Sequence, residues 1–263
     1  MIVWENAWYE PHSSSRMLHV YLPDWYYDSS ERFPVMYFFD GHNLFFDEHA
    51  TFGRSWRLTS FLDRWEKPMI ICGMECSHVE GERTSEYNPY ERRVAGQVGR
   101  ALGEQTFQWL IHEVKPLVDG RFRTWPHREA TGLAGADMGG LMALYGVICH
   151  NRIFGKAASL SSNVRFHRRE LMRDLMTSDI SPDTRVYLSW GEHEAGRLYI
   201  EGSDFDPLWD SAEARATQEI AAEMESRGAV AHVHYQHSTR RYEADWDRQV
   251  PRLMDFLWLD RRW

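Results

Sequence analysis

Short apolar segments alternate with amphipathic helical patterns along most of the chain. The apolar segments have the length and the β-branched and aromatic content of strands, whereas the segments between them repeat apolar positions at helical spacing. Strands are predicted at 17–22, 34–39, 69–74, 130–134, 157–160, 186–190 and 230–235. Helices are predicted at 55–65, 105–118, 141–149, 169–176, 212–226 and 247–258, with Gly120 ending the second. This alternation is typical of an α/β fold, a mostly parallel sheet with helices on both faces.

We expect a single α/β domain over residues 1–263. A chain of 263 residues can bury one large core, and no internal repeat, low-complexity tract or Pro/Ser-rich linker divides it. About two dozen residues separate the strands at 157–160 and 186–190, which is enough for one helix and its turns. That interval leaves no room for a large lid domain.

Composition and charge exclude several classes of protein. The formal net charge is −9, with acidic and basic residues mixed along the chain, which does not favour nucleic-acid binding. Cys72, Cys76 and Cys149 cannot form a disulfide framework and lack zinc-ligand spacing. The first residues do not read as a signal peptide, and no apolar run has membrane-spanning length. We therefore expect a cytoplasmic protein without a cofactor, and self-association stays open.

The most informative motif is AGADMGG at 134–140, which has the pattern of a nucleophile elbow with aspartate at its tip. In the G-x-S-x-G elbow a strand turns sharply into a helix and presents a serine at the sheet edge. Gly135 and Gly139 occupy the glycine positions, and Asp137 stands where serine is expected. Aspartate is among the few non-glycine residues that tolerate the left-handed backbone of such a tip.

Other motifs accompany the elbow along nearly the whole chain. They are VYLP at 20–23, YFFDGHNLF at 37–45, RTSEYNP at 83–89, FRT at 122–124, FGKAASLS at 154–161 and EADW at 243–246. In this order and at these intervals, the sequence resembles the esterase family of α/β-hydrolases that includes esterase D (S-formylglutathione hydrolase), enterochelin esterases and feruloyl esterases. The resemblance implies an α/β-hydrolase fold and a site for ester chemistry.

The resemblance also implies where a catalytic triad would lie. Its serine position is Asp137, and its acid position is Glu194, with Glu192 close by. Its histidine position, five residues before Trp246, is Arg241. The triad therefore reads Asp, Glu, Arg instead of serine, acid and histidine.

An oxyanion hole and the walls of a cleft are implied in the same way. The oxyanion hole would use the backbone at Met138 and His42, and the cleft would include Asn43, Arg83 and Tyr87. No metal site is expected.

These changes remove the chemistry of a serine hydrolase. Serine attacks when a base near neutral pKa accepts its proton, and arginine keeps its own proton at physiological pH. A carboxylate at the tip would be favoured by the helix N-terminus and could occupy the space meant for the oxyanion. We expect Arg241 to bridge Asp137 and Glu194 in an ion-pair network, although a solvated loop position for Arg241 stays open.

Two functions follow from this pattern. The first is a non-catalytic family member that binds a small-molecule ligand or a partner through the former ester cleft. The second is a hydrolase with Asp137 as nucleophile, His237 as base and Glu194 as acid, as in haloalkane dehalogenases and epoxide hydrolases. Those enzymes generally carry a lid domain, for which this chain has no room. His232 and His234 share a strand face but are too few to indicate a metal site.

Overall fold

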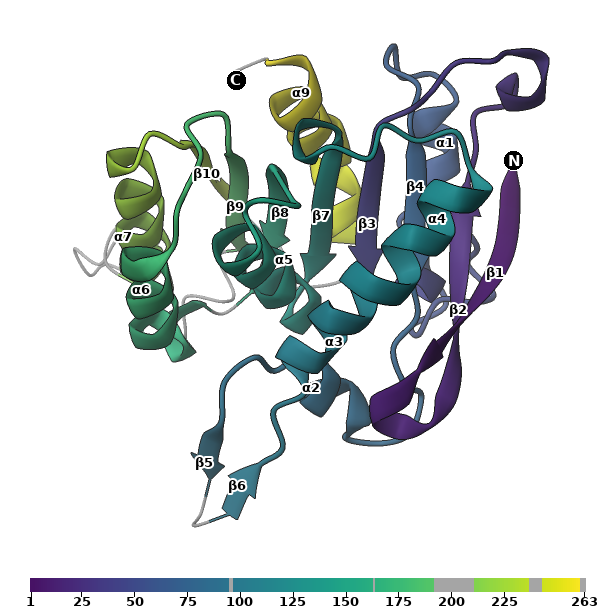
Figure 1. Ribbon diagram of the computed structural model, residues 1–263. Coiled ribbons are helices and arrows are strands. Elements are labelled where there is room, and N and C mark those ends of the chain that lie inside the picture. Colours follow the sequence, from purple (N-terminus) through teal and green to yellow (C-terminus); the bar gives the residue numbers. More distant parts are fainter. Residues whose placement is uncertain (95–96, 163, 192–210, 237–242, 261–263) are drawn as a thin grey trace.

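The computed structural model describes residues 1–94, 97–162, 164–191, 211–236 and 243–260 (Figure 1). Its centre is an eight-stranded sheet of order β1-β2-β4-β3-β7-β8-β9-β10. From β4 to β10 neighbouring strands are parallel, whereas β2 is antiparallel to both β1 and β4. The strands are β1 (Ile2–Tyr9), β2 (Ser14–Tyr21), β3 (Val35–Phe39), β4 (Ile70–Met74), β7 (Thr131–Ala136), β8 (Lys156–Leu160), β9 (Arg185–Gly191) and β10 (Val230–Gln236).

Helices cover both faces of the sheet (Figure 1). One face carries α3 (Gly103–Trp109), a π-helical turn (Leu110–Val114), α4 (Lys115–Arg121), α5 (Met138–Cys149), α6 (Arg168–Thr177) and α7 (Ala212–Ser226). The other face carries α1 (Leu58–Leu62) and α9 (Val250–Leu259). Within the described ranges, no helix has the length and apolarity needed to cross a bilayer.

The central strands separate two apolar cores. In β3, Tyr37 and Phe39 pack into the core under α3 and α5, while Met36 and Phe38 pack against the α9 side. This division follows from the two-residue period of a strand, which sends neighbouring side chains to opposite faces. The strand is apolar throughout because both faces are covered, as is usual for parallel sheets.

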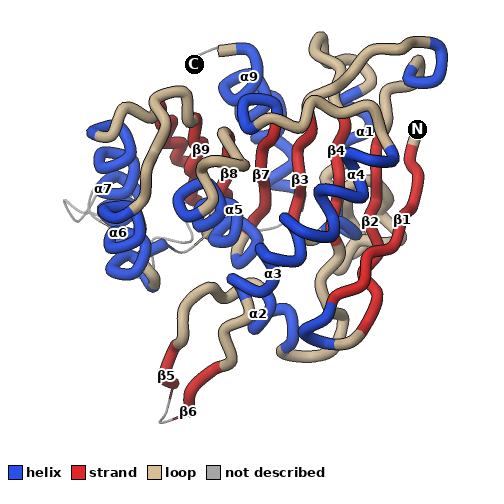
Figure 2. The backbone as a smooth tube through the Cα atoms, viewed as in Figure 1, coloured by secondary structure: helices blue, strands red, loops and turns tan. Residues whose placement is uncertain are grey.

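A short hairpin extends away from the sheet (Figure 2). It is formed by β5 (Arg92–Val94) and β6 (Gln97–Gly99), which pair in antiparallel register. The hairpin follows α2 (Glu82–Glu86), a short helix that lies below the carboxyl ends of the central strands in Figure 1.

The expected α/β architecture is confirmed, and the predicted strands are present with boundaries that differ by a few residues. The sequence pattern did not reveal β1, because its large side chains Trp4 and Trp8 point to solvent while the smaller Ala7 is buried. In β1, the positions of the large apolar side chains therefore do not indicate which face of the strand is buried.

Two predicted helices were wrong in extent. The helix predicted over 55–65 is confined to α1, because the backbone N–H and hydroxyl of Ser55 both donate to Asp47 instead of joining a helical turn. The helix predicted over 105–118 continues through Gly120 to Arg121. Gly120 therefore does not end that helix.

The turn from β7 into α5 is closely packed. A Cβ atom on Gly135 would lie 2.5 Å from the backbone carbonyl carbon of Gly139, so the strand and the helix meet at a distance that only glycine permits. A Cβ on Gly139 would lie 2.9 Å from the Cβ of Phe39 and 3.2 Å from Oδ2 of Asp40. The two glycines thus bring α5 against the end of β3.

Gly135→Ala is expected to lower the free energy of unfolding by about 1–3 kcal/mol, because backbone would have to move to admit the methyl group. The measurement is the urea midpoint of the purified variant. Gly120→Ala is the control, since no heavy atom lies within 4 Å of the position that its Cβ would take. It should be neutral or stabilising by up to about 1 kcal/mol. Equal midpoints for the two variants would contradict the close packing of the elbow.

Candidate active site

Asp137 sits at the sharp turn between β7 and α5. Its backbone has φ 55° and ψ −124°, and its N–H donates to the carbonyl oxygen of Leu160 at 2.9 Å. A positive φ is unfavourable for a residue with a side chain and persists where the surroundings impose it. The surrounding strands and the close contact of the elbow glycines impose it here. The side chain, about a third exposed at 35%, lines a cavity.

The main charge contact of the site is made by Arg83 on α2. Its Nε donates to Oδ1 of Asp40 at 2.8 Å and its Nη2 donates to Oδ2 at 2.8 Å, a two-point contact that matches the planar guanidinium to a carboxylate. Its Nη1 donates to Oδ2 of Asp137 at 3.4 Å. One guanidinium therefore joins two carboxylates that come from the ends of adjacent strands.

The environment of Arg83 favours its charged state. Burial alone would disfavour the guanidinium charge, but the two-point contact with Asp40 outweighs it and raises the pKa of Arg83. The guanidinium also lies over the ring of Tyr87, 5.3 Å from its centroid. The Tyr87 hydroxyl accepts the backbone N–H of Asp40 at 3.1 Å. Tyr87 thus contacts both partners of the ion pair: its ring lies against the guanidinium of Arg83, and its hydroxyl accepts a hydrogen bond from the backbone of Asp40.

The cavity beside Asp137 has a volume of about 530 Å³. Its walls combine carboxylates, imidazoles and aromatic rings from several loops at the carboxyl edge of the sheet. It is lined by Asp40, His42, Asn43, Thr51, Phe52, Cys76, Ser77, His78, Arg83, Ala136, Asp137, Glu243 and Trp246. A concave space of this size, with both polar groups and apolar surface in its lining, can hold a small molecule.

Two buried titratable groups in the wall are shifted toward their neutral forms. Burial raises the pKa of Glu243, and the nearby charge of Asp40 adds to the rise. Burial lowers the pKa of His42, whose Nε2 lies 2.9 Å from the hydroxyl of Thr51. A base or acid in this wall would therefore differ in strength from one in water.

The structure brings several of the residues expected from the sequence to this cavity. Asp137, His42, Asn43 and Arg83 all line it, and Tyr87 lies beneath Arg83. Met138 is the first residue of α5, directly after the elbow tip. Their catalytic and binding roles stay predictions.

Three further site residues lie outside the described residues: Glu194, Arg241 and His237. The proposed bridge from Arg241 to Asp137 and the alternative base therefore also stay predictions. Among the described residues, Arg83 places a cation beside Asp137, and the sequence suggested Arg83 only as a cleft residue.

Sequence reasoning assigned no role to Asp40 or Glu243. Asp40 immediately follows β3, where the carboxyl ends of parallel strands meet, and this position could have suggested it. Glu243 opens α8 (Glu243–Trp246) and is almost fully buried. A glutamate three residues before a tryptophan gives no comparable signal in the sequence.

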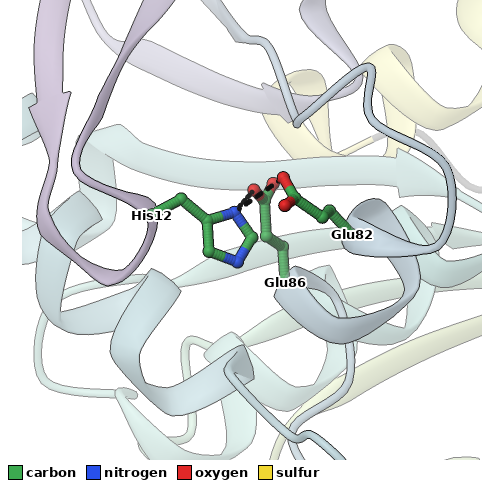
Figure 3. Close-up of side chains that lie close together, drawn as sticks. All are labelled: His12, Glu82 and Glu86. Carbon is green, nitrogen blue, oxygen red and sulfur yellow. Dashed lines mark ion pairs between the residues drawn. The ribbon is translucent and has the colours of Figure 1, made fainter.

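One group of side chains has the composition of a metal site. His12, Glu82 and Glu86 bring donor atoms within 4.8 Å of one another, and Nδ1 of His12 faces both carboxylates (Figure 3). However, Nη2 of Arg16 donates to Oε1 of Glu86 at 2.5 Å, so a cation already pairs with one of the two carboxylates. We interpret the group as an ion-pair network. Nδ1 of His234 lies 2.7 Å from Nη1 of Arg252.

Comparisons with known proteins place this fold in a family. The family model described as "Putative esterase" matches residues 12–255, which is most of the chain. The chain belongs to this esterase family.

Relatives of this esterase-family chain are distant. The uncharacterized protein YbbA of Bacillus subtilis (strain 168) is 24% identical over 190 residues, covering 70% of this chain and 71% of YbbA. Esterase Rv1288 of Mycobacterium tuberculosis (strain ATCC 25618 / H37Rv) is 25% identical over 209 residues, which cover 77% of this chain and 39% of that esterase. The chain therefore spans well under half of the mycobacterial protein.

Solved structures share the fold of this esterase-family chain over its whole length. An IroE-like serine hydrolase from Shewanella oneidensis superimposes with a TM-score of 0.77 at 15% identity, covering 99% of this chain and 81% of that chain. The enterobactin esterase FES from Shigella flexneri gives a TM-score of 0.70 at 17% identity, covering 99% and 59%. These likenesses establish the α/β-hydrolase architecture.

Arg83→Met is expected to lower the free energy of unfolding by about 1–3 kcal/mol, because the carboxylate of Asp40, with a side chain only 11% exposed, would lose its two-point partner. Chemical denaturation measures the change.

Arg168→Met is the matched control, since Arg168 pairs with Glu219 on the surface, where both side chains are more than 40% exposed (45% and 43%). Its effect should stay below about 1 kcal/mol. If Arg83→Met were no less stable than Arg168→Met, Arg83 would not anchor the site.

Proposed function

We propose that this esterase-family chain is not a competent ester hydrolase and that its cleft binds a small-molecule ligand. The observation that carries the proposal is the carboxylate of Asp137 at the elbow tip, 3.4 Å from the guanidinium of Arg83. Arg83 is in turn held by Asp40, so the charge beside Asp137 has a fixed position.

This arrangement is unfavourable for attack on an ester. A nearby guanidinium stabilises the carboxylate and reduces its tendency to form a bond with carbon. Attack by Asp137 on an ester carbonyl would give a mixed anhydride, which would then need a base to direct water to it. The carboxylate charge also opposes the negative charge that an oxyanion would place at the same end of the cleft.

The lining of the cleft suggests the chemistry of the ligand. Asp40, Asp137 and Glu243 offer carboxyl oxygens that accept hydrogen bonds, while Phe52 and Trp246 offer aromatic surface. A ligand with hydroxyl or amine donors on a ring would use both the carboxyl acceptors and the aromatic surface.

A ligand class of this kind occurs among the similar structures. The enterobactin esterase from Shigella flexneri was solved with enterobactin and with 2,3-dihydroxy-N-benzoyl-serine. The dihydroxybenzoyl group carries both the donors and the ring that the lining would accept. Hydroxylated aromatic conjugates are therefore the first ligands to test.

The cytoplasmic location expected from the sequence stays a prediction.

A second function is favoured by the exposure of Asp137. Because its side chain is 35% exposed and lines the cavity, a ligand could reach it. Asp137 would then act as nucleophile and displace the leaving group from a substrate carbon. Water activated by His237, with Glu194 as acid, would attack the carboxyl carbon of Asp137 and release the product.

Hydrolysis of a panel of short-chain p-nitrophenyl esters distinguishes the two functions. We expect the wild type and Asp137→Ala to be equally slow, and Asp137→Ser/Arg241→His to be faster than both, because the double variant regains a neutral nucleophile and a base. Ester hydrolysis about 10³–10⁴-fold faster than in water does not require an intact triad. The decisive comparison is therefore whether the hydrolysis rate depends on Asp137.

Robust turnover by the wild type that Asp137→Ala abolishes would contradict the proposal. Titration of the same proteins with 2,3-dihydroxy-N-benzoyl-serine, followed by calorimetry, then separates binding from catalysis. Binding by the wild type without hydrolysis is the expected result.

A further inference from the structure

Strand β1 forms an outer edge of the eight-stranded sheet (Figure 1). On its inner side it pairs with β2 over all eight residues without a break in register, so it carries no bulge. Among the described residues, no hydrogen bond reaches the backbone N–H and C=O groups of β1 that face away from β2. These groups are therefore available to another strand.

The sequence of β1 lacks the features that usually protect an edge strand. Natural edge strands are short, are bulged, or carry lysine or proline, because an exposed edge otherwise pairs with other chains. β1 has eight residues, IVWENAWY, with neither lysine nor proline and with Glu5 as its one charged side chain. An edge of this length and composition indicates a surface that another strand covers.

One face of this edge is apolar. Trp4 and Trp8 are 51% and 54% exposed, and Met17 on the neighbouring strand β2 is 38% exposed. The three side chains share a face, because Met17 lies opposite Asn6, which stands two residues from each tryptophan. The ring of Trp4 stacks on Phe46, with centroids 6.4 Å apart. Exposed aromatic side chains grouped in this way are typical of an interaction surface.

We propose that β1 pairs in antiparallel register with β1 of a second copy of the chain, about a two-fold axis at Asn6. The strand is self-complementary about this residue, because Trp4 and Trp8 each lie two positions from it. In a pair centred at Asn6, Trp4 of each copy lies opposite Trp8 of the other, which gives two cross-strand aromatic contacts. The proposal does not depend on the function proposed for Asp137.

The charges of β1 favour this register over its neighbours. With the axis at Asn6, Glu5 lies opposite Ala7, so no like charges are opposed. An axis at Glu5 would place the two Glu5 carboxylates opposite each other, which is destabilising. An axis at Ala7 would place Trp8 opposite Asn6. Neither of these two registers pairs tryptophan with tryptophan.

The exposed area of the tryptophans indicates how strong the dimer is. A tryptophan side chain buries about 150–250 Å² when it is fully covered, so four half-exposed indoles would together bury on the order of 400 Å². With the backbone of two strand edges added, the buried area would fall near the lower end of the range of about 1,200–2,000 Å² that is usual for specific complexes. We therefore expect a dimer that dissociates on dilution.

Sedimentation velocity of the full chain over about 1–200 µM tests the proposal, and a concentration-dependent change from monomer to dimer is expected. Trp4→Glu/Trp8→Glu should weaken the dimer at least about 100-fold, because it removes four aromatic side chains per interface and opposes like charges. Trp125→Glu is the matched control, since Trp125 is 48% exposed but lies outside β1, and it should leave the dimer unchanged. A wild type that stays monomeric, or a dimer that Trp4→Glu/Trp8→Glu leaves intact, would overturn the proposal.

Crosslinking tests the position of the axis. The two Asn6→Cys side chains would face each other across it, with Cβ atoms about 4.5–5.5 Å apart, so a short bis-maleimide should link the copies. Ser15→Cys is the control, because Ser15 is exposed on the same face but lies one strand further in, opposite Trp8. Because Asn6 is exposed, Asn6→Cys keeps the test valid if the tryptophan variant fails to fold. Linking of Asn6→Cys no faster than that of Ser15→Cys would contradict the pairing.

Discussion

The contact of Arg83 with two aspartates is the interaction on which the site depends. It joins α2 to the ends of β3 and β7, which meet at the same edge of the sheet. The carboxylate of Asp40 is mostly buried, and a buried charge is costly unless it is paired and hydrogen-bonded. Arg83 supplies both requirements. The same guanidinium also places a positive charge next to Asp137. The ion pair that stabilises the cleft therefore also affects the chemistry of Asp137.

The fold has the geometry of a sharp strand-to-helix elbow with Asp137 at its tip. Gly135 and Gly139 allow β7 and α5 to approach, and Asp137 adopts the positive φ of the turn. These features depend on backbone packing and not on the identity of the reacting atom. Membership of the esterase family therefore fixes the architecture, whereas the activity has to be argued from the side chains in the cleft.

The sequence predicted those features that arise from local patterns. The strand at 35–39 was found because both of its faces are buried, and the elbow was found because its glycine spacing is local. The pairing of Arg83 with Asp137 was not found, since 54 residues separate them and only the folded loops bring them together. The contact between His19 and Glu75 was missed for the same reason, because the two residues meet only through the register of β2 and β4.

Isotope incorporation during turnover tests most directly whether Asp137 reacts. The protein is incubated with an ester substrate in water enriched in ¹⁸O, and the peptide that contains Asp137 is then weighed by mass spectrometry. If Asp137 displaces the alcohol of the ester and forms a covalent mixed anhydride, water that attacks this intermediate at the aspartate carbon leaves ¹⁸O in its carboxylate. A carboxylate that stays paired with Arg83 acquires no label, and we predict that result. Substrate-dependent labelling of Asp137 would contradict the account.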